Sequence, residues 1–375
     1  MKKKNINPFF FDLNIQEKKK LLSNFDNILK SGVLILGNNT ENFEKKFAET
    51  INTKYAISLN TGTTALEILI NYRTKLKKTL IAVQTNTNFA TVASIIRANG
   101  SPVYLDMSYK YLSPTYEEVK KKFKFYKFKG LVWVHIGGII SPDFIKIVKF
   151  CKKNKIFLIE DCAHAHGSKL NNKFAGSFAQ GGAFSFFPTK IMTTMEGGMI
   201  TTNDLKLRNF AISMRNQGKG LQKFGCFHID FGNSWRMLEI SSALGLIQLK
   251  KLSKIIKKRF NVYKIYKKAL EETKIKHSNS SHMQQASNYK FVIYGKNVKH
   301  TNYVKAELKK NRIICGGGVY ERPCHLQPVF KKFNKYTKDL KISEKFCPLQ
   351  ICLPIHSGMS ENDARYSIKK LIDVY

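Results

Sequence analysis

Short apolar runs alternate with longer segments of helical periodicity along the first 250 or so residues. Apolar side chains recur every three or four positions at 15–31, from about 40, at 89–98 and at 143–153, which predicts amphipathic helices. The shorter apolar runs are expected to be strands, at 55–60, 79–84, 102–106, 131–135, 156–159, 184–187 and 199–202. Repeated strand and helix units of this length predict an α/β fold with a mostly parallel central sheet flanked by helices. In such sheets, chemistry gathers at the carboxyl ends of the strands.

The pattern changes after about residue 234. A helical segment at 234–272, interrupted near 252–253, is followed by a polar loop at 277–288. Strand candidates at 289–294 and 313–314, a glycine turn at 316–318 and a closing helix at 360–375 predict a smaller C-terminal α/β domain. We therefore expect an N-terminal arm and large domain at 1–255 and a small domain at 256–375.

Lys190 stands where an extended aromatic run ends. Pro188 stops the strand predicted at 184–187, so Lys190 is expected on a tight connection between two strands of a packed region. A desolvated lysine is a good nucleophile toward carbonyl groups, because its amine is more easily freed of its proton. The alternative is a lysine that extends its charged end to solvent from the end of a strand.

The turn at 61–64 joins a predicted strand to a predicted helix through Thr61, Gly62, Thr63 and Thr64. Free N–H groups and the helix dipole make such a helix start a good site for a phosphate. A helix simply capped by threonine is the alternative. The chain has no phosphate-loop or dinucleotide-binding glycine motif.

Glu160 and Asp161 follow the apolar strand predicted at 156–159. A carboxylate at this buried edge needs a cation or hydrogen-bond donors, so Asp161 is expected to have a positively charged partner. His164 and His166 lie close in sequence, but the spacing matches no established set of metal ligands, and we predict no metal site.

The composition limits the classes of protein to which the chain can belong. The formal charge is +38, yet the lysines are dispersed along the chain, which favours a general compositional bias over a nucleic-acid surface and would still attract anionic substrates. No apolar run approaches the roughly 20 residues of a membrane span, and no signal peptide is recognisable. Seven scattered cysteines without a zinc pattern fit reduced thiols. We expect a soluble cytoplasmic protein that binds neither membrane nor nucleic acid.

A phosphate site, a strand-end carboxylate and a strand-end lysine together suit pyridoxal 5'-phosphate. At this point the chain resembles the DegT/DnrJ/EryC1/StrS sugar aminotransferases, a branch of the fold-type I enzymes that use this cofactor. The resemblance runs nearly end to end, through motifs at 61–66, 160–167, 184–190, 196–199, 232–237 and 325–328.

The resemblance implies roles for individual residues. Lys190 would bind the cofactor's aldehyde and carry the proton, and Asp161 would keep the ring nitrogen protonated. His164, where relatives often have Gln, would lie near the ring or its phenolic oxygen. The remaining positions are expected to hold the phosphate (Gly62, Thr63, Ser185 and Asn233, the last from a neighbouring subunit), the ring (Asn88) and the substrate (Arg236 and His325).

Some positions depart from the family pattern. Many relatives place an aromatic residue on the ring where this chain has Asn88 and Phe89, so either Asn88 covers the ring without stacking or Phe89 shifts into place. Met195 and Trp235 also differ from the usual residues.

The resemblance implies a homodimeric aminotransferase that moves an amino group, from glutamate, onto a nucleotide-linked keto-sugar in polysaccharide or glycan synthesis. Three alternatives stay open: a dehydratase of the same family, against which Lys190 argues; an aminotransferase for a non-nucleotide cyclic ketone; and a non-catalytic binding or regulatory protein.

Overall fold

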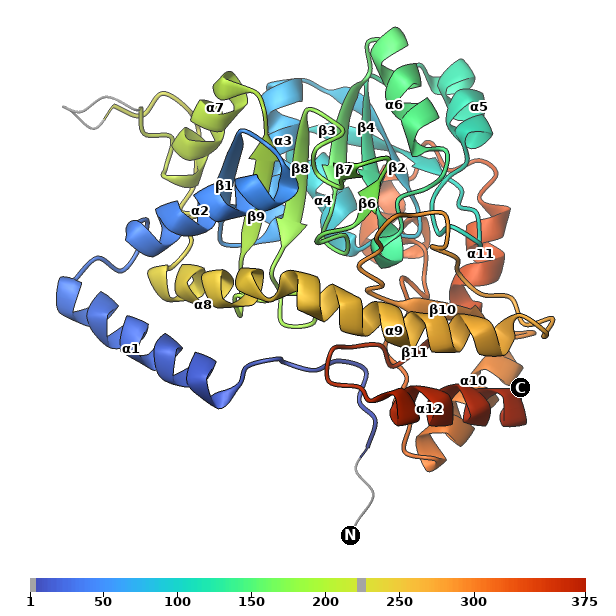
Figure 1. Cartoon of the computed structure of the whole chain (residues 1–375). Coiled ribbons are helices and arrows are strands. Elements are labelled where there is room, and N and C mark those ends of the chain that lie inside the picture. Colours follow the sequence, from blue (N-terminus) through green and yellow to red (C-terminus); the bar gives the residue numbers. More distant parts are fainter. Residues whose placement is uncertain (1–4, 221–226) are drawn as a thin grey trace.

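The computed structural model describes residues 5–220 and 227–375 of the 375-residue chain. Seven strands form the central sheet (Figure 1). β9 runs antiparallel to both of its neighbours, and the other strands are parallel to one another, which confirms the predicted mostly parallel sheet. In spatial order the strands are β1 (Tyr55–Leu59), β9 (Gly198–Thr202), β8 (Gly181–Ser185), β5 (Phe157–Asp161), β4 (Gly130–Val134), β2 (Thr79–Gln84) and β3 (Gly100–Leu105).

Helices cover both faces of this sheet (Figure 1). Successive side chains of a strand point to opposite faces, so in β4 Leu131 and Trp133 join one hydrophobic cluster while Val132 joins the other. Burial on both faces explains why this strand is a continuous apolar run. The first cluster takes in α2 (Asn38–Ile51), α5 (Tyr116–Tyr126), α6 (Phe144–Lys153) and α8 (Glu239–Lys250), and the second takes in α3 (Gly62–Thr74), α4 (Phe89–Arg97) and α7 (Leu205–Arg215).

The C-terminal part has a hydrophobic core of its own. β10 (Phe291–Tyr294) pairs antiparallel with β11 (Gln350–Leu353), and three helices pack around them: α9 (Leu252–Leu270), α10 (Val298–Lys310) and α12 (Glu361–Val374). Helix α9 runs through the predicted boundary near residue 255. Part of the later chain returns to the large sheet, where Cys324, Phe330 and Leu340 join its core.

The remaining elements are short or peripheral. α1 (Ile15–Ser31) lies at the edge of the molecule beside α8 (Figure 1). β6 (Lys169–Leu170) pairs with β7 (Lys173–Phe174), and α11 (Lys341–Phe346) follows short 3-10 helices at Cys324–Leu326 and Pro328–Phe333. Two others are at Ile136–Gly138 and Cys347–Leu349.

Several sequence predictions need correction. The helix expected from residue 234 begins at Glu239, and the strand expected at 184–187 is β8, which ends at Ser185. The strand expected at 313–314 is a single bridge between Ile313 and Ile6 of the N-terminal arm.

None of the helices in the described part of the chain has the length and apolar character that a membrane crossing requires. The cysteines in this part of the chain have free thiols, and Cys226 lies outside the described residues.

Candidate active site

A cavity of about 330 Å³ opens near the carboxyl ends of β4, β5 and β8. Seven of the sequence-predicted site residues line it together: Gly62, Thr63, Asn88, Asp161, His164, Ser185 and Lys190. The fold therefore brings together predicted site residues that are up to 128 positions apart in the sequence, from Gly62 to Lys190.

The start of α3 forms one wall of the cavity. Thr61 caps this helix, with its hydroxyl oxygen accepting from the Thr64 N–H at 3.1 Å. A Cβ atom on Gly62 would lie 2.7 Å from the Cβ of Ser185 and 3.0 Å from the Phe184 carbonyl oxygen, so only glycine lets α3 approach β8 this closely. Helix N–H groups and the Ser185 side chain meet here, as a phosphate site requires.

Asp161 lies at the end of β5 and is only 4% exposed. One carboxylate oxygen accepts from the Thr91 hydroxyl at 2.8 Å, and the other accepts from the Ala163 N–H at 3.1 Å. Burial raises the pKa of Asp161 above its ordinary value, although these hydrogen bonds and the charge of Lys190 oppose the shift. The group is therefore suited to a cationic partner inside the cavity.

Lys190 lies on the turn that follows β8, where its N–H donates to the Phe187 carbonyl oxygen at 2.9 Å. Its side chain is half-buried and lines the cavity, with Nζ 5.3 Å from the centre of the Tyr289 ring. No carboxylate in the described part of the chain lies within 4.0 Å of this ammonium group. This placement fits the reactive alternative better than a solvated lysine.

His164 contacts two tyrosines that were not predicted from the sequence, Tyr289 and Tyr320. Its ring stacks on Tyr289 at a centroid distance of 4.0 Å, and its Nε2 lies 3.3 Å from the Tyr320 hydroxyl oxygen. Burial first, and then the positive charges of Lys190 and Lys290, lower the pKa of His164 well below its usual value. Tyr320 itself lines the cavity. No sequence signal identified either tyrosine, because both come from the C-terminal part and reach the site only in the fold.

The open question about Asn88 and Phe89 has a structural answer. Phe89 is 48% exposed and stacks on Phe330 at 5.4 Å, and it does not line the cavity. Asn88 caps α4 by accepting from the Ala90 N–H, and it does line the cavity. Asn88, and not Phe89, is therefore the residue at this wall.

Three predicted residues lie outside the cavity of this chain. Asn233 is exposed on the segment before α8, and Arg236 binds Asn216 and Ser234. His325 is buried, with Nδ1 2.6 Å from the Thr85 hydroxyl oxygen and Nε2 3.1 Å from a Glu344 carboxylate oxygen. Both ring nitrogens of His325 are therefore engaged by side chains of its own chain, and its expected contact with the substrate stays a prediction.

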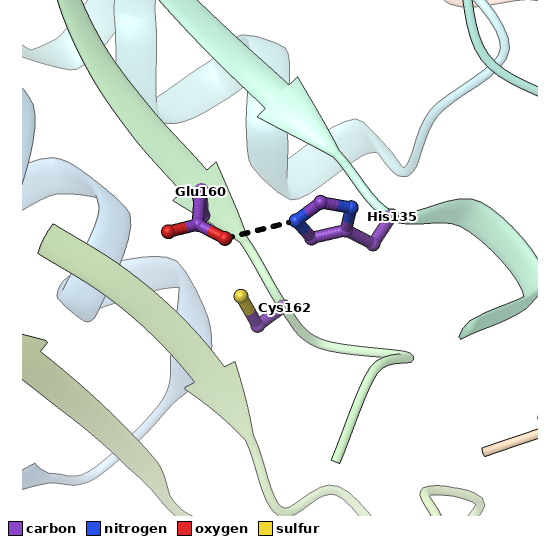
Figure 2. Close-up of side chains that lie close together, drawn as sticks. All are labelled: His135, Glu160 and Cys162. Carbon is purple, nitrogen blue, oxygen red and sulfur yellow. Dashed lines mark hydrogen bonds and ion pairs between the residues drawn. The ribbon is translucent and has the colours of Figure 1, made fainter. Parts of the chain in front are cut away.

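One side-chain cluster has the composition of a metal site: His135, Glu160 and Cys162 (Figure 2). Glu160 is fully buried and accepts four hydrogen bonds: His135 Nε2 at 3.0 Å and the N–H groups of Gly176, Phe178 and Ala179 at 2.8–2.9 Å. A carboxylate has about four lone-pair sites, so these donors occupy all of them. Hydrogen bonding therefore accounts for the arrangement of the cluster without a metal ion, and the expectation that no metal is bound stays a prediction.

Comparison with known proteins places this chain in a family. The model of the DegT/DnrJ/EryC1/StrS aminotransferase family matches residues 15–372. GDP-perosamine synthase of Escherichia coli O157:H7 is 29% identical over 340 residues, 90% of this chain and 91% of that protein. UDP-4-amino-4,6-dideoxy-N-acetyl-beta-L-altrosamine transaminase of Helicobacter pylori is 28% identical over 360 residues, 93% and 92% of the two chains.

The solved structures agree with the sequence relatives. Helicobacter pylori PseC, an aminotransferase involved in the biosynthesis of pseudoaminic acid, superposes with a TM-score of 0.90 at 25% identity, over 99% of each chain. A DegT DnrJ EryC1 StrS aminotransferase of Brucella abortus has a TM-score of 0.87. The predicted fold class is thus confirmed. The chain belongs to the DegT/DnrJ/EryC1/StrS family of aminotransferases.

Proposed function

We propose that this aminotransferase uses pyridoxal 5'-phosphate to move an amino group from glutamate to a keto-sugar carried on a nucleotide. The observation that carries the proposal is the convergence of Lys190, Asp161 and the Gly62 turn on one cavity. Relatives of 28–29% identity are named for perosamine and altrosamine nucleotide sugars, which supports a nucleotide-linked amino sugar as the product.

The residues present fit this cofactor. Gly62 keeps the N-terminus of α3 against Ser185, which leaves helix N–H groups and a hydroxyl for the phosphate. Asp161 would hold a proton on the ring nitrogen, because its buried carboxylate is stabilised by a cation. The cofactor, when bound, supplies an electron sink for a carbanion at the amine-bearing carbon.

Lys190 would do the proton chemistry in both half-reactions. Its Nζ is the amine in the cavity that would take a proton from the donor's carbon and return one to the acceptor's carbon. The charge of +38 favours the approach of an anionic nucleotide sugar, because long-range attraction raises the encounter rate.

We also propose that the active unit is a dimer with shared sites. Asn233 does not reach the cavity of its own chain, as expected for a residue that serves a partner. Large apolar side chains stay exposed on either side of it in the sequence: Phe227 (67%), Ile229 (66%), Phe231 (97%) and Leu238 (52%). Apolar surface of this kind marks an interaction site.

Replacing Lys190 tests the proposed function. We expect Lys190→Ala to lower the transamination rate at least about a thousandfold, because the variant lacks both the nucleophile and the proton carrier. A panel of nucleotide keto-sugars with glutamate, read by mass spectrometry, measures this rate and identifies the substrate. Borohydride should also fix pyridoxal phosphate onto Lys190 of the unmodified protein.

The matched control is Lys299→Ala on α10, where the lysine is exposed. This variant should keep the full rate. The proposal fails if Lys190→Ala retains activity, or if the unmodified protein neither takes up pyridoxal phosphate nor aminates any sugar of the panel.

A further inference from the structure

Tyr320 is a cavity residue without a role so far. It follows the glycine turn at 316–318 and lines the cavity beside Asn88 and His164, although it is more than 150 positions from His164 in the sequence. Its hydroxyl oxygen lies 3.3 Å from His164 Nε2. Tyr320 can donate its own proton to a bound molecule only if His164 is the donor in this contact.

A backbone N–H group determines which of the two side chains is the donor. The Gly137 N–H donates to His164 Nδ1 at 3.4 Å, so Nδ1 must carry a lone pair and no proton. His164 is buried, and burial holds its pKa well below the usual value, so the ring is neutral and has one proton. That proton is therefore on Nε2, and His164 is the donor to the Tyr320 oxygen.

A second neighbour acts on Tyr320 in the same direction. Asn88 uses its side-chain oxygen to accept from the Ala90 N–H at 2.9 Å, which leaves the amide NH₂ as its free end. The nearby Asn88 side chain lowers the pKa of the Tyr320 phenol, but burial outweighs this effect and holds that pKa well above the ordinary value. The phenol thus stays protonated, and His164 donates to its oxygen, so the proton of the phenol is available to another acceptor.

We propose that Tyr320 donates a hydrogen bond to an oxygen of the molecule bound in the cavity, and that His164 is the positioning residue that turns the Tyr320 hydroxyl toward it. The proposal rests on the function proposed above. The acceptor is an oxygen either of the cofactor ring or of the sugar, and the two sources give different results in the test.

Three variants separate these roles. Tyr320→Phe removes the donor. His164→Leu removes the group that orients it. His164→Gln keeps the relay, because its carbonyl oxygen can accept from Gly137 and its NH₂ can donate to Tyr320. Each variant is measured by titration of the cofactor-free protein with pyridoxal phosphate, and by KM and kcat for the nucleotide keto-sugar that the panel identifies.

Tyr320→Phe should weaken one of the two binding steps about tenfold, the loss expected for one hydrogen bond to an oriented donor. A weaker Kd for pyridoxal phosphate assigns the acceptor to the cofactor, and a higher KM with unchanged cofactor affinity assigns it to the sugar. His164→Leu should reproduce the same loss, His164→Gln should stay within about twofold of the unmodified protein, and the Leu and Phe changes combined should be less than additive.

The control is Tyr303→Phe on α10, whose tyrosine is 53% exposed, and it should change neither quantity. The proposal is wrong if Tyr320→Phe matches this control in both titrations, or if His164→Gln loses as much as His164→Leu. Failure of the proposed function shows differently, as an unmodified protein that does not bind pyridoxal phosphate or does not transaminate.

Discussion

At the scale of single residues, the cavity holds two buried groups, Asp161 and His164, whose charged forms are destabilised by burial. Burial raises the pKa of Asp161 and lowers that of His164, because a charge removed from water is costly in both cases. Asp161 keeps hydrogen bonds from Thr91 and Ala163, yet in the described chain it has no ion pair. The buried carboxylate therefore lowers the stability of the cofactor-free protein, and the same carboxylate gives the site affinity for a cation.

The Asp161→Asn variant should separate these two properties. It removes the charge at nearly constant shape, so we expect activity to fall about 10²–10³-fold through loss of electrostatic stabilisation. The cofactor-free variant should nevertheless have a higher Tm than the unmodified cofactor-free protein at about pH 7. Thermal unfolding of the two cofactor-free proteins, with the transamination rate measured in parallel, checks both expectations.

The gain in Tm expected for Asp161→Asn should change with pH in a definite direction. The folded-state pKa of Asp161 lies above the ordinary 3.8, so the folded protein takes up the proton before the unfolded chain does as pH falls. The cost of the charge is complete above the folded-state pKa and disappears below 3.8. The Tm difference between Asp161→Asn and the unmodified protein should therefore shrink on acidification, and a difference that grows would contradict this account.

At the scale of elements, strand β5 serves two sites with adjacent residues. Side chains alternate along a strand, so Asp161 lines the cavity while Glu160 lies on the opposite side of β5. Glu160 accepts from His135 there (Figure 2), and it also accepts from N–H groups of the loop at 176–179. The Glu160 hydrogen bonds tie the ends of β4 and β5 to that loop. Rigid support of this kind keeps the neighbouring Asp161 in place.

Glu160→Gln should show that this anchor is made of hydrogen bonds. The NH₂ of the amide would face N–H donors on one side, leaving buried donors unsatisfied, and we expect a loss of about 2–4 kcal/mol in the free energy of unfolding. Urea denaturation of the two proteins measures the loss. A chelator should leave the unmodified protein's Tm unchanged, and a Tm that falls with chelator and recovers with zinc would show that the cluster binds a metal.

The helices and strands that could be predicted are those with a strong local pattern in the sequence. The continuous apolar runs of β4 and β5 and the Ser360 cap of α12 are visible without tertiary contacts. β11 was missed because Gln350–Leu353 is a four-residue segment that follows a turn of 3-10 helix and becomes a strand only by pairing with β10. The pair at 313–314 has strand-like residues, but its partner is the single residue Ile6.

The residues of the candidate site also differ in how far the local sequence predicts them. Residues that stand next to a clear local pattern, such as Asp161 at the end of an apolar strand or Lys190 after an aromatic run and Pro188, could be predicted one by one. Tyr289 and Tyr320 could not, because their place in the site depends on how the C-terminal part returns to the large sheet. The role of Asn233 depends on a second chain, and the roles of Asn233, Arg236 and His325 stay predictions.

At the scale of the whole molecule, unpartnered apolar residues gather on particular segments. Phe231 is 97% exposed, and α1 exposes Leu22, Phe25 and Leu29 beside α8 (Figure 1). An isolated chain with such a surface is prone to association. We expect Phe231→Asp to shift the protein toward the monomer in light scattering, whereas Phe125→Asp, at a phenylalanine that is 69% exposed on α5, should leave its mass unchanged.

Mixing two inactive variants tests whether the sites are shared. If each site takes Lys190 from one chain and Asn233 from the other, a dimer of one Lys190→Ala chain and one Asn233→Ala chain contains one intact site and one doubly altered site. Random exchange of equal amounts makes half of the dimers mixed, so about a quarter of the unmodified activity should return. Activity that stays at the sum of the two separate variants, although mass spectrometry detects the mixed dimer, would place Asn233 outside the partner's site.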